Sequence, residues 1–183
     1  MIREEAWKLL NEYTKKENLI KHALSVEALM RAYAKKFGED EEYWGVVGLI
    51  HDFDYDMYPS MDDHPFKGAE ILREKGVDED IVKSVLAHAP HSGEPRDTLL
   101  KKTIFAVDEL AGFITAVALV RPSKKVEDVK VKSVRKKFKD KAFAAAVSRE
   151  EIRQGIEELG VDEGEHIQLC IDAMSGIADQ LGL

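Results

Sequence analysis

The chain has 183 residues, a length that fits one domain or one domain with a small appended subdomain. Its 44% hydrophobic and 34% charged residues exclude a disordered chain, and its net charge of −8 argues against general nucleic-acid binding. No apolar run approaches the roughly 20 residues of a membrane helix and the N-terminus has no apolar signal-peptide core, so we expect a cytoplasmic protein without membrane association.

Apolar residues recur at helical spacing through the first third of the chain and predict three helices. The first contains Trp7, Leu10 and Tyr13, the second covers 19–37 from an Asn18 cap to Gly38, and the third covers 41–53. Asp40 or Glu39 caps the third helix, and acids in its first turn suit the helix dipole. His51 and Asp52 fall at its C-terminal end, directly after an apolar run.

The middle of the chain predicts an acidic loop over 54–63, followed by two short helices and a long one. These helices run from His64 or Pro65 to Gly76, from an Asp78 cap to about His88, and from Asp97 or Thr98 to about Val120. The stretch 89–98 contains two prolines and a glycine and is expected to be irregular.

Residues 121–141 form a basic segment with ten Lys or Arg and three acids. Such a segment either holds an anionic ligand such as a phosphate or is a solvated connection, with one or two short helices. Ser148 and Glu151 match a capping box, and a last helix is expected from about Asp162 to Gly182. Within it, Cys170 is expected to be a buried core thiol.

The whole pattern predicts an all-α fold, because no stretch alternates with period two and no hairpin turn or glycine-rich phosphate loop occurs. We expect residues 1–121 to form a helical domain and residues 122–183 a C-terminal helical extension packed on it. The two parts are expected to make one compact unit.

Polar residues that emerge from apolar helices are the main sign of chemistry. His51 and Asp52 end one apolar helix, and Asp108 follows three apolar residues inside another. Buried polar groups need partners, and one metal ion satisfies imidazole and carboxylate together. With His22 upstream, these residues predict a site for a divalent transition metal, with Mn, Fe, Co, Ni or Zn as candidates.

The order of His22, then His51-Asp52 in GLIHDFDYD, then Asp108 in AVDELAGF resembles the HD-domain superfamily of metal-dependent phosphohydrolases. That family has a His, a His-Asp pair and a distant Asp on the helices of an all-α domain. The segment HPFKGAEILREKGVDEDIVKSVLAHAPHSG is similar to the His-Pro…Gly-Ala-Glu region of its HDIG subset. The resemblance covers residues 15–120, and 121–181 are similar to a C-terminal extension in one bacterial and archaeal branch.

The resemblance implies one or two divalent metal ions. His22, His51, Asp52 and Asp108 would hold the first ion. His64 and His88 would hold a second ion, with Asp52 bridging the two and His91 as an alternative or additional ligand. Phe53-Asp54 stands where the HDIG subset has Ile-Gly, and no Gly-Tyr-Pro motif occurs, which speaks against cyclic-dinucleotide cleavage.

Further candidates lie near these residues in the sequence. Asp54 or Asp56 is a candidate general base or a carboxylate that supports a ligand. Lys101 lies seven residues before Asp108, which places both on one helix face, so Lys101 could meet a substrate phosphate. Glu109, beside Asp108, is expected to face water.

The function implied is hydrolysis of a phosphate ester, such as a nucleotide, by a water that the metal activates, with Asp52 at the catalytic centre. The expected partner is therefore a small phosphorylated substrate, with a homodimer left open. Two alternatives stay open on the same scaffold. One is a di-iron oxygenase, and the other is a domain that binds a nucleotide or metal as a sensor without turnover.

Overall fold

The computed structural model describes residues 1–183 and contains helices and no strand, which confirms the all-α prediction. The helices are α1 Arg3–Tyr13, α2 Glu17–Phe37, α3 Glu41–Ile50, α4 Phe66–Glu74, α5 Glu79–Ala87, α6 Leu99–Leu119, α7 Val131–Phe138, α8 Arg149–Leu159, α9 Glu163–Ser175 and α10 Ala178–Leu181. Short 3₁₀ turns occur at Pro90–Ser92 and Val126–Asp128. None of these helices is long and apolar enough to cross a membrane.

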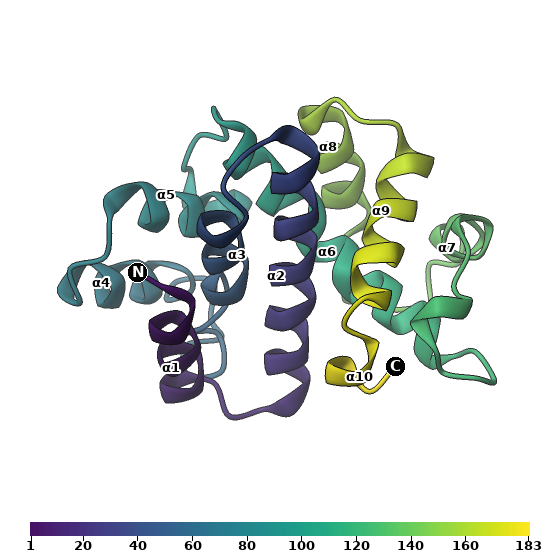
Figure 1. Ribbon diagram of the computed structural model, residues 1–183, viewed down its shortest axis with the longest axis horizontal. Coiled ribbons are helices and arrows are strands. Elements are labelled where there is room, and N and C mark those ends of the chain that lie inside the picture. The colour runs from purple at the N-terminus through teal and green to yellow at the C-terminus, as the bar shows by residue number, and fades with distance from the viewer.

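The two 21-residue helices α2 and α6 contact each other and form the centre of the fold. Figure 1 shows α1, α3, α4 and α5 on one side of this pair and α7, α8 and α9 on the other. Buried apolar residues from both parts of the chain belong to a single core cluster. The predicted boundary at residue 121 therefore separates two regions that share one core, and it stays a prediction.

Two glycines allow helices to approach closely around this centre. A Cβ at Gly48 of α3 would lie 2.9 Å from the carbonyl oxygen of Val26 on α2. A Cβ at Gly155 of α8 would lie 2.6 Å from the Cα of Ala106 on α6. The first contact fixes the end of α3, which carries His51, against α2. The second presses the C-terminal extension onto the helix that carries Asp108.

Several predicted helix boundaries are confirmed, and the predicted capping residues form them. The side chains of Asp40, Asp78, Thr98, Ser148 and Asp162 each accept a hydrogen bond from a backbone N–H of the following first turn. Gly38 ends α2 in the left-handed conformation, with a φ of 75°.

Three boundaries were wrong. The cap of α2 is Lys16 and not Asn18, because the helix begins two residues earlier than expected, with Glu17 in its first turn. α3 ends at Ile50, and the chain continues as tight turns through residue 57 instead of as helix to Phe53. The expected last helix is two helices, α9 and α10, separated at Gly176 and Ile177.

Two polar residues of α9 lie inside the core. Cys170 is fully buried, as predicted, and burial raises the pKa of its thiol. His166 is also fully buried: its Nε2–H donates to the carbonyl of Ala106 over 3.0 Å, and its Nδ1 accepts from the hydroxyl of Tyr33. Both ring nitrogens are thus used by a neutral imidazole, and a proton added at Nδ1 would remove the acceptor for Tyr33.

Burial lowers the pKa of His166 from 6.5 to about 4, so the unfolded chain binds this proton more readily than the folded one. Stability that is fully present above pH 6.5 is therefore lost as the pH falls toward 4, by about 3 kcal/mol at the acid end of this window. We predict that His166→Gln is less stable at pH 7 but lacks this loss, so the stability gap to wild type narrows on acidification. Urea unfolding of both proteins across this pH range, in a chelator, measures the gap. Parallel curves would contradict the assignment.

Candidate metal centre

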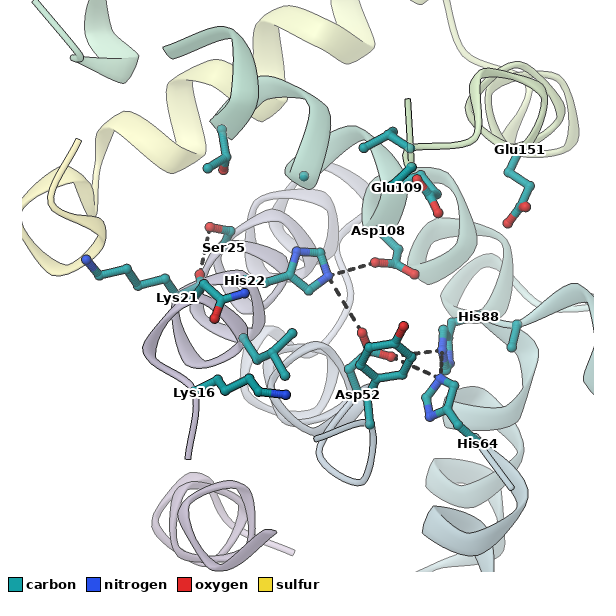
Figure 2. Close-up of a pocket in the computed structure, with 18 of the residues that line it drawn as sticks. Lys16, Lys21, His22, Ser25, Asp52, His64, His88, Asp108, Glu109 and Glu151 are labelled. Carbon is teal, nitrogen blue, oxygen red and sulfur yellow. Dashed lines mark hydrogen bonds and ion pairs between the residues drawn. The ribbon is translucent and has the colours of Figure 1, made fainter. Parts of the chain in front are cut away.

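Three helices bring the predicted first set of ligands together. His22 comes from α2, His51 and Asp52 directly follow α3, and Asp108 comes from α6. One side-chain atom of each lies within 4.8 Å of all the others. The Nε2 atom of His22 is 2.9 Å from Oδ1 of Asp108 and 4.0 Å from Oδ2 of Asp52. Figure 2 shows His22 directed toward both carboxylates.

His51 occupies the most enclosed position of this set. Its ring is fully buried, and its Nδ1–H donates to the carbonyl of Gly48 over 2.7 Å. That bond leaves Nε2 directed into the cluster, 3.5 Å from Asp52 and 3.3 Å from Asp108. This Nε2 atom has no hydrogen-bond partner although it is buried. A buried polar atom without a partner is costly, and here it faces two carboxylates.

A second set forms around the other oxygen of Asp52. The Nε2 atoms of His64 and His88 lie 3.2 and 3.1 Å from Oδ1 of Asp52 and 3.1 Å from each other. His88 follows α5, and His64 lies in the turns that precede α4. Asp52 therefore offers Oδ2 to the first set and Oδ1 to the second, as Figure 2 shows for its neighbours His22, His64 and His88.

The histidine tautomers determine what the two sets can bind. The Nδ1–H of His88 donates to the carbonyl of Val85, and that of His64 donates to a carboxylate oxygen of Asp54. Since His51 is anchored in the same way, each of the three rings would, in its neutral form, present an Nε2 lone pair to carboxylate oxygens. Lone pairs that converge on one another repel unless a cation lies between them. His and Asp are suitable donors for divalent transition metals, so the residues present fit a metal centre.

The electrostatics of the cluster point the same way. Burial opposes the charged form of His51, but the carboxylates of Asp52 and Asp108 raise its pKa to about 9. Burial likewise opposes charge on His64, whose hydrogen bonds to Asp52 and Asp54 raise its pKa to about 10. Burial disfavours ionised Asp52 and Asp108, yet the adjacent histidines hold the pKa of each carboxyl below its usual value. The negative potential that stabilises these imidazolium protons also favours a divalent cation, which would displace them.

Asp54 supports a ligand and has no oxygen free for proton transfer. It is fully buried, its Oδ1 accepts from His64, and its Oδ2 accepts from the backbone N–H of Gly68 over 2.8 Å. A Cβ at Gly68 would lie 2.8 Å from the carboxyl carbon of Asp54. Glycine at this position of the Gly-Ala-Glu motif therefore lets α4 approach the carboxylate that orients His64.

Asp56, the other candidate base, lies in the turns after α3 and contacts the residues just before α2. Its carboxylate accepts from the backbone N–H groups of Lys15 and Lys16 and forms an ion pair with the Lys16 ammonium at 2.8 Å. The hydrogen bond from the Lys16 side chain is the largest of the contacts that lower the pKa of Asp56 to about 2. An acid held in this way is a poor proton acceptor at neutral pH.

Two predicted residues lie outside both sets. Lys101 is buried against Glu94 and Asp97, with its Nζ 2.7 and 3.1 Å from their carboxylates, and it does not line the pocket. The expectation that Lys101 meets a substrate phosphate was wrong, because these acids hold it near the start of α6. His91 lines the pocket, but its Nε2–H donates to the carbonyl of His64 over 2.8 Å.

A pocket of about 1150 Å³ opens onto the two sets. Its walls include apolar residues of α2, α6 and the chain after α7, among them Leu19, Leu119 and Val147. Figure 2 shows Lys16 and Lys21 on one side of His22, and Glu109 and Glu151 on the side of Asp108. The C-terminal extension thus forms part of the pocket wall, a role that its sequence did not predict.

Glu109 corrects an expectation, since it was expected to face water. It is half-buried in the pocket wall, where one carboxylate oxygen accepts from the backbone N–H of Ser148 over 2.9 Å. Burial, together with the neighbouring Asp108 carboxylate, raises the pKa of Glu109 to about 7. No local pattern could have found this residue, because its partner lies 39 residues away.

Residues 19–112 match the HD domain family, which is about half of the chain. Ribonuclease Y of Nitratidesulfovibrio vulgaris is 27% identical over 169 residues, which cover 90% of this chain and 32% of that protein. Ribonuclease Y of Thermotoga petrophila is 27% identical over 176 residues, covering 90% and 33%. A tRNA (cytidine(56)-2'-O)-methyltransferase of Thermoplasma volcanium is 32% identical over 105 residues, covering 52% and 31%.

The chain spans about a third of the length of these curated relatives. No solved structure matches it significantly. The family match and the His/Asp clusters together fit the metal site of a metal-dependent phosphohydrolase.

The role of Asp54 predicts a selective effect on metal binding. Asp54→Asn should weaken the hold on the His64 ring and lower the affinity of the second set by about 10- to 100-fold, leaving the first set intact. Asp56→Asn is the matched control, because Asp56 lies in the same loop but contacts no histidine. Titration of the metal-free proteins with Mn²⁺ by calorimetry measures both sites. Equal losses in the two variants, or none in Asp54→Asn, would contradict this role.

Proposed function

This chain belongs to the HD domain family, and from that premise we propose that it hydrolyses a phosphate ester with two divalent metal ions that share Asp52. The observation that carries the proposal is that the Nε2 atoms of His51, His64 and His88 converge on the two oxygens of the Asp52 carboxylate. The Nε2 atom of His51 is buried and has no hydrogen-bond partner. Groups placed in this way have no stable arrangement among themselves at neutral charge. Metal cations held by these residues would satisfy them.

When bound, divalent ions supply Lewis acidity, which acidifies water to a pKa near 7 and neutralises charge on a phosphate. The residues of the chain do the remaining work. Asp52 would serve both ions, while His22, His51 and Asp108 would complete one set and His64 and His88 the other. Backbone carbonyls and Asp54 keep the His51, His64 and His88 rings in the tautomer that ligation needs.

The pocket supports a substrate with few phosphate groups. Its only lysines are Lys16 and Lys21, and each forms an ion pair at 2.8 Å, with Asp56 and Glu17 respectively. The charge of a phosphate would therefore be balanced mainly at the metal centre. The apolar wall beside it is large enough for a nucleoside-sized group. Because relatives are named ribonuclease Y, phosphodiesters should be tested as substrates as well.

The test uses p-nitrophenyl phosphate and bis(p-nitrophenyl) phosphate with Mn²⁺, Fe²⁺, Co²⁺, Ni²⁺ or Zn²⁺ added to metal-free protein. We predict phosphate-ester hydrolysis that a chelator abolishes, and a fall of at least about 10³-fold in kcat for Asp52→Asn, with unchanged helical content. Asp62→Asn, an exposed acid of the same loop, is the matched control and should match wild type.

Full activity in Asp52→Asn would contradict the proposal. Turnover that needs Fe²⁺ and O₂ and releases no phosphate would replace it with the oxygenase. Tight nucleotide binding without turnover under every metal would replace it with the sensor.

A further inference from the structure

The segment 121–141 displays lysines that the rest of the fold leaves unpaired. Of its ten basic residues, Arg135 and Lys137 form ion pairs, with Glu163 and Asp140. Seven exposed lysines in the segment form none, and we name them the lysine surface: Lys124, Lys125, Lys130, Lys132, Lys136, Lys139 and Lys141. Outside the segment, ten of the seventeen basic residues form ion pairs with acids. Unpaired positive charge is therefore concentrated in this one segment of an acidic protein.

The backbone that carries the lysine surface is fixed by the core. Val126, Val129 and Val134 are almost completely buried, and α7 packs against α6 and α9. The ring of Phe138, at the end of α7, lies 4.7 Å from the ring of Phe113 on α6. The lysines thus project from an ordered platform and not from a loose tail. Figure 1 shows α7 at the end of the molecule opposite α4 and α5.

The arrangement on α7 is unfavourable for the helix by itself. Lys132, Lys136 and Lys139 follow the i, i+4, i+7 spacing and form a row along one side, where neighbouring like charges repel. Lys130 is the N-cap, makes no side-chain capping bond, and is followed by a first turn without acids. Positive charge therefore also lies at the positive end of the helix dipole. A bound polyanion would relieve both repulsions.

We propose that the lysine surface docks nucleic acid through its backbone phosphates. Seven cations spread over the segment fit a repeating anion better than a single phosphate, and none of them lines the metal pocket. The apolar side of α7 is used in the core, so the helix has no free apolar face to enter a lipid surface. A nucleic acid carries a phosphate on every nucleotide, whereas an acidic peptide rarely carries a charge on every residue, so the peptide would gain less from counterion release.

This docking does not depend on the proposed hydrolysis, although the segment is joined in the chain to residues of the metal pocket. Leu119 and Val147, which flank the segment on both sides in the chain, line the metal pocket. The net charge of −8 argues against a general affinity for nucleic acid, so binding should be local, without sequence preference, and sensitive to salt.

The test compares two triple variants by fluorescence anisotropy with a labelled single-stranded RNA of about 20 nucleotides, at roughly 50 to 200 mM salt. One variant is Lys132→Gln, Lys136→Gln and Lys139→Gln. The control is Lys8→Gln, Lys35→Gln and Lys83→Gln, which removes equal charge from exposed lysines that form no ion pair elsewhere. We expect the first variant to lose at least about tenfold in affinity and about 2 in the slope of log K against log salt, and the control to match wild type.

Three results would overturn the proposal: no RNA binding by wild type at the lowest salt, equal losses in both triple variants, or tighter lysine-dependent binding to phosphatidylserine vesicles or polyglutamate than to RNA. Hydrolysis of p-nitrophenyl phosphate by the first variant should equal that of wild type. That assay separates failure of the docking surface from failure of the proposed hydrolysis.

Discussion

The carboxylate of Asp52 is the constraint around which the first part of the chain is arranged. Its two oxygens face different groups of histidines, and those histidines come from three helices and a loop. Without a metal ion or added protons, these groups place imidazole lone pairs, including that of a buried nitrogen without a partner, against negative charge. The family match and this geometry are therefore two independent observations that agree on a metal centre.

The scaffold holds this centre through residues that are not themselves metal ligands. Gly48 lets α3 approach the backbone of α2, and its carbonyl then anchors the ring of His51. Gly68 lets α4 approach Asp54, whose carboxylate orients His64. Both glycines lack a side chain, which allows the helices to pack closely. The close packing in turn places the groups that orient the rings of His51 and His64.

The sequence predicted those features that depend on interactions between residues close together in the chain. Caps such as Asp40 and Ser148 and the left-handed Gly38 could be placed because their hydrogen bonds are made within four residues. The metal residues could be selected by their order along the chain. The surroundings of Glu109 could not, because its partner Ser148 lies on the extension. The extension's part in the pocket wall likewise depends on contacts between distant segments. Lys101 differs, because the acids that hold it, Glu94 and Asp97, lie close before it in the chain, and the spacing to Asp108 was given more weight than these neighbours.

The most direct test of the account is anomalous diffraction from crystals grown with Mn²⁺, with data collected so that the manganese signal locates the ions. The account predicts two anomalous peaks, one on each side of the Asp52 carboxylate, with His22, His51 and Asp108 around one and His64 and His88 around the other. A single peak between His22, His51, Asp52 and Asp108 would reduce the centre to one ion. Peaks away from Asp52, or none at saturating Mn²⁺, would contradict the account.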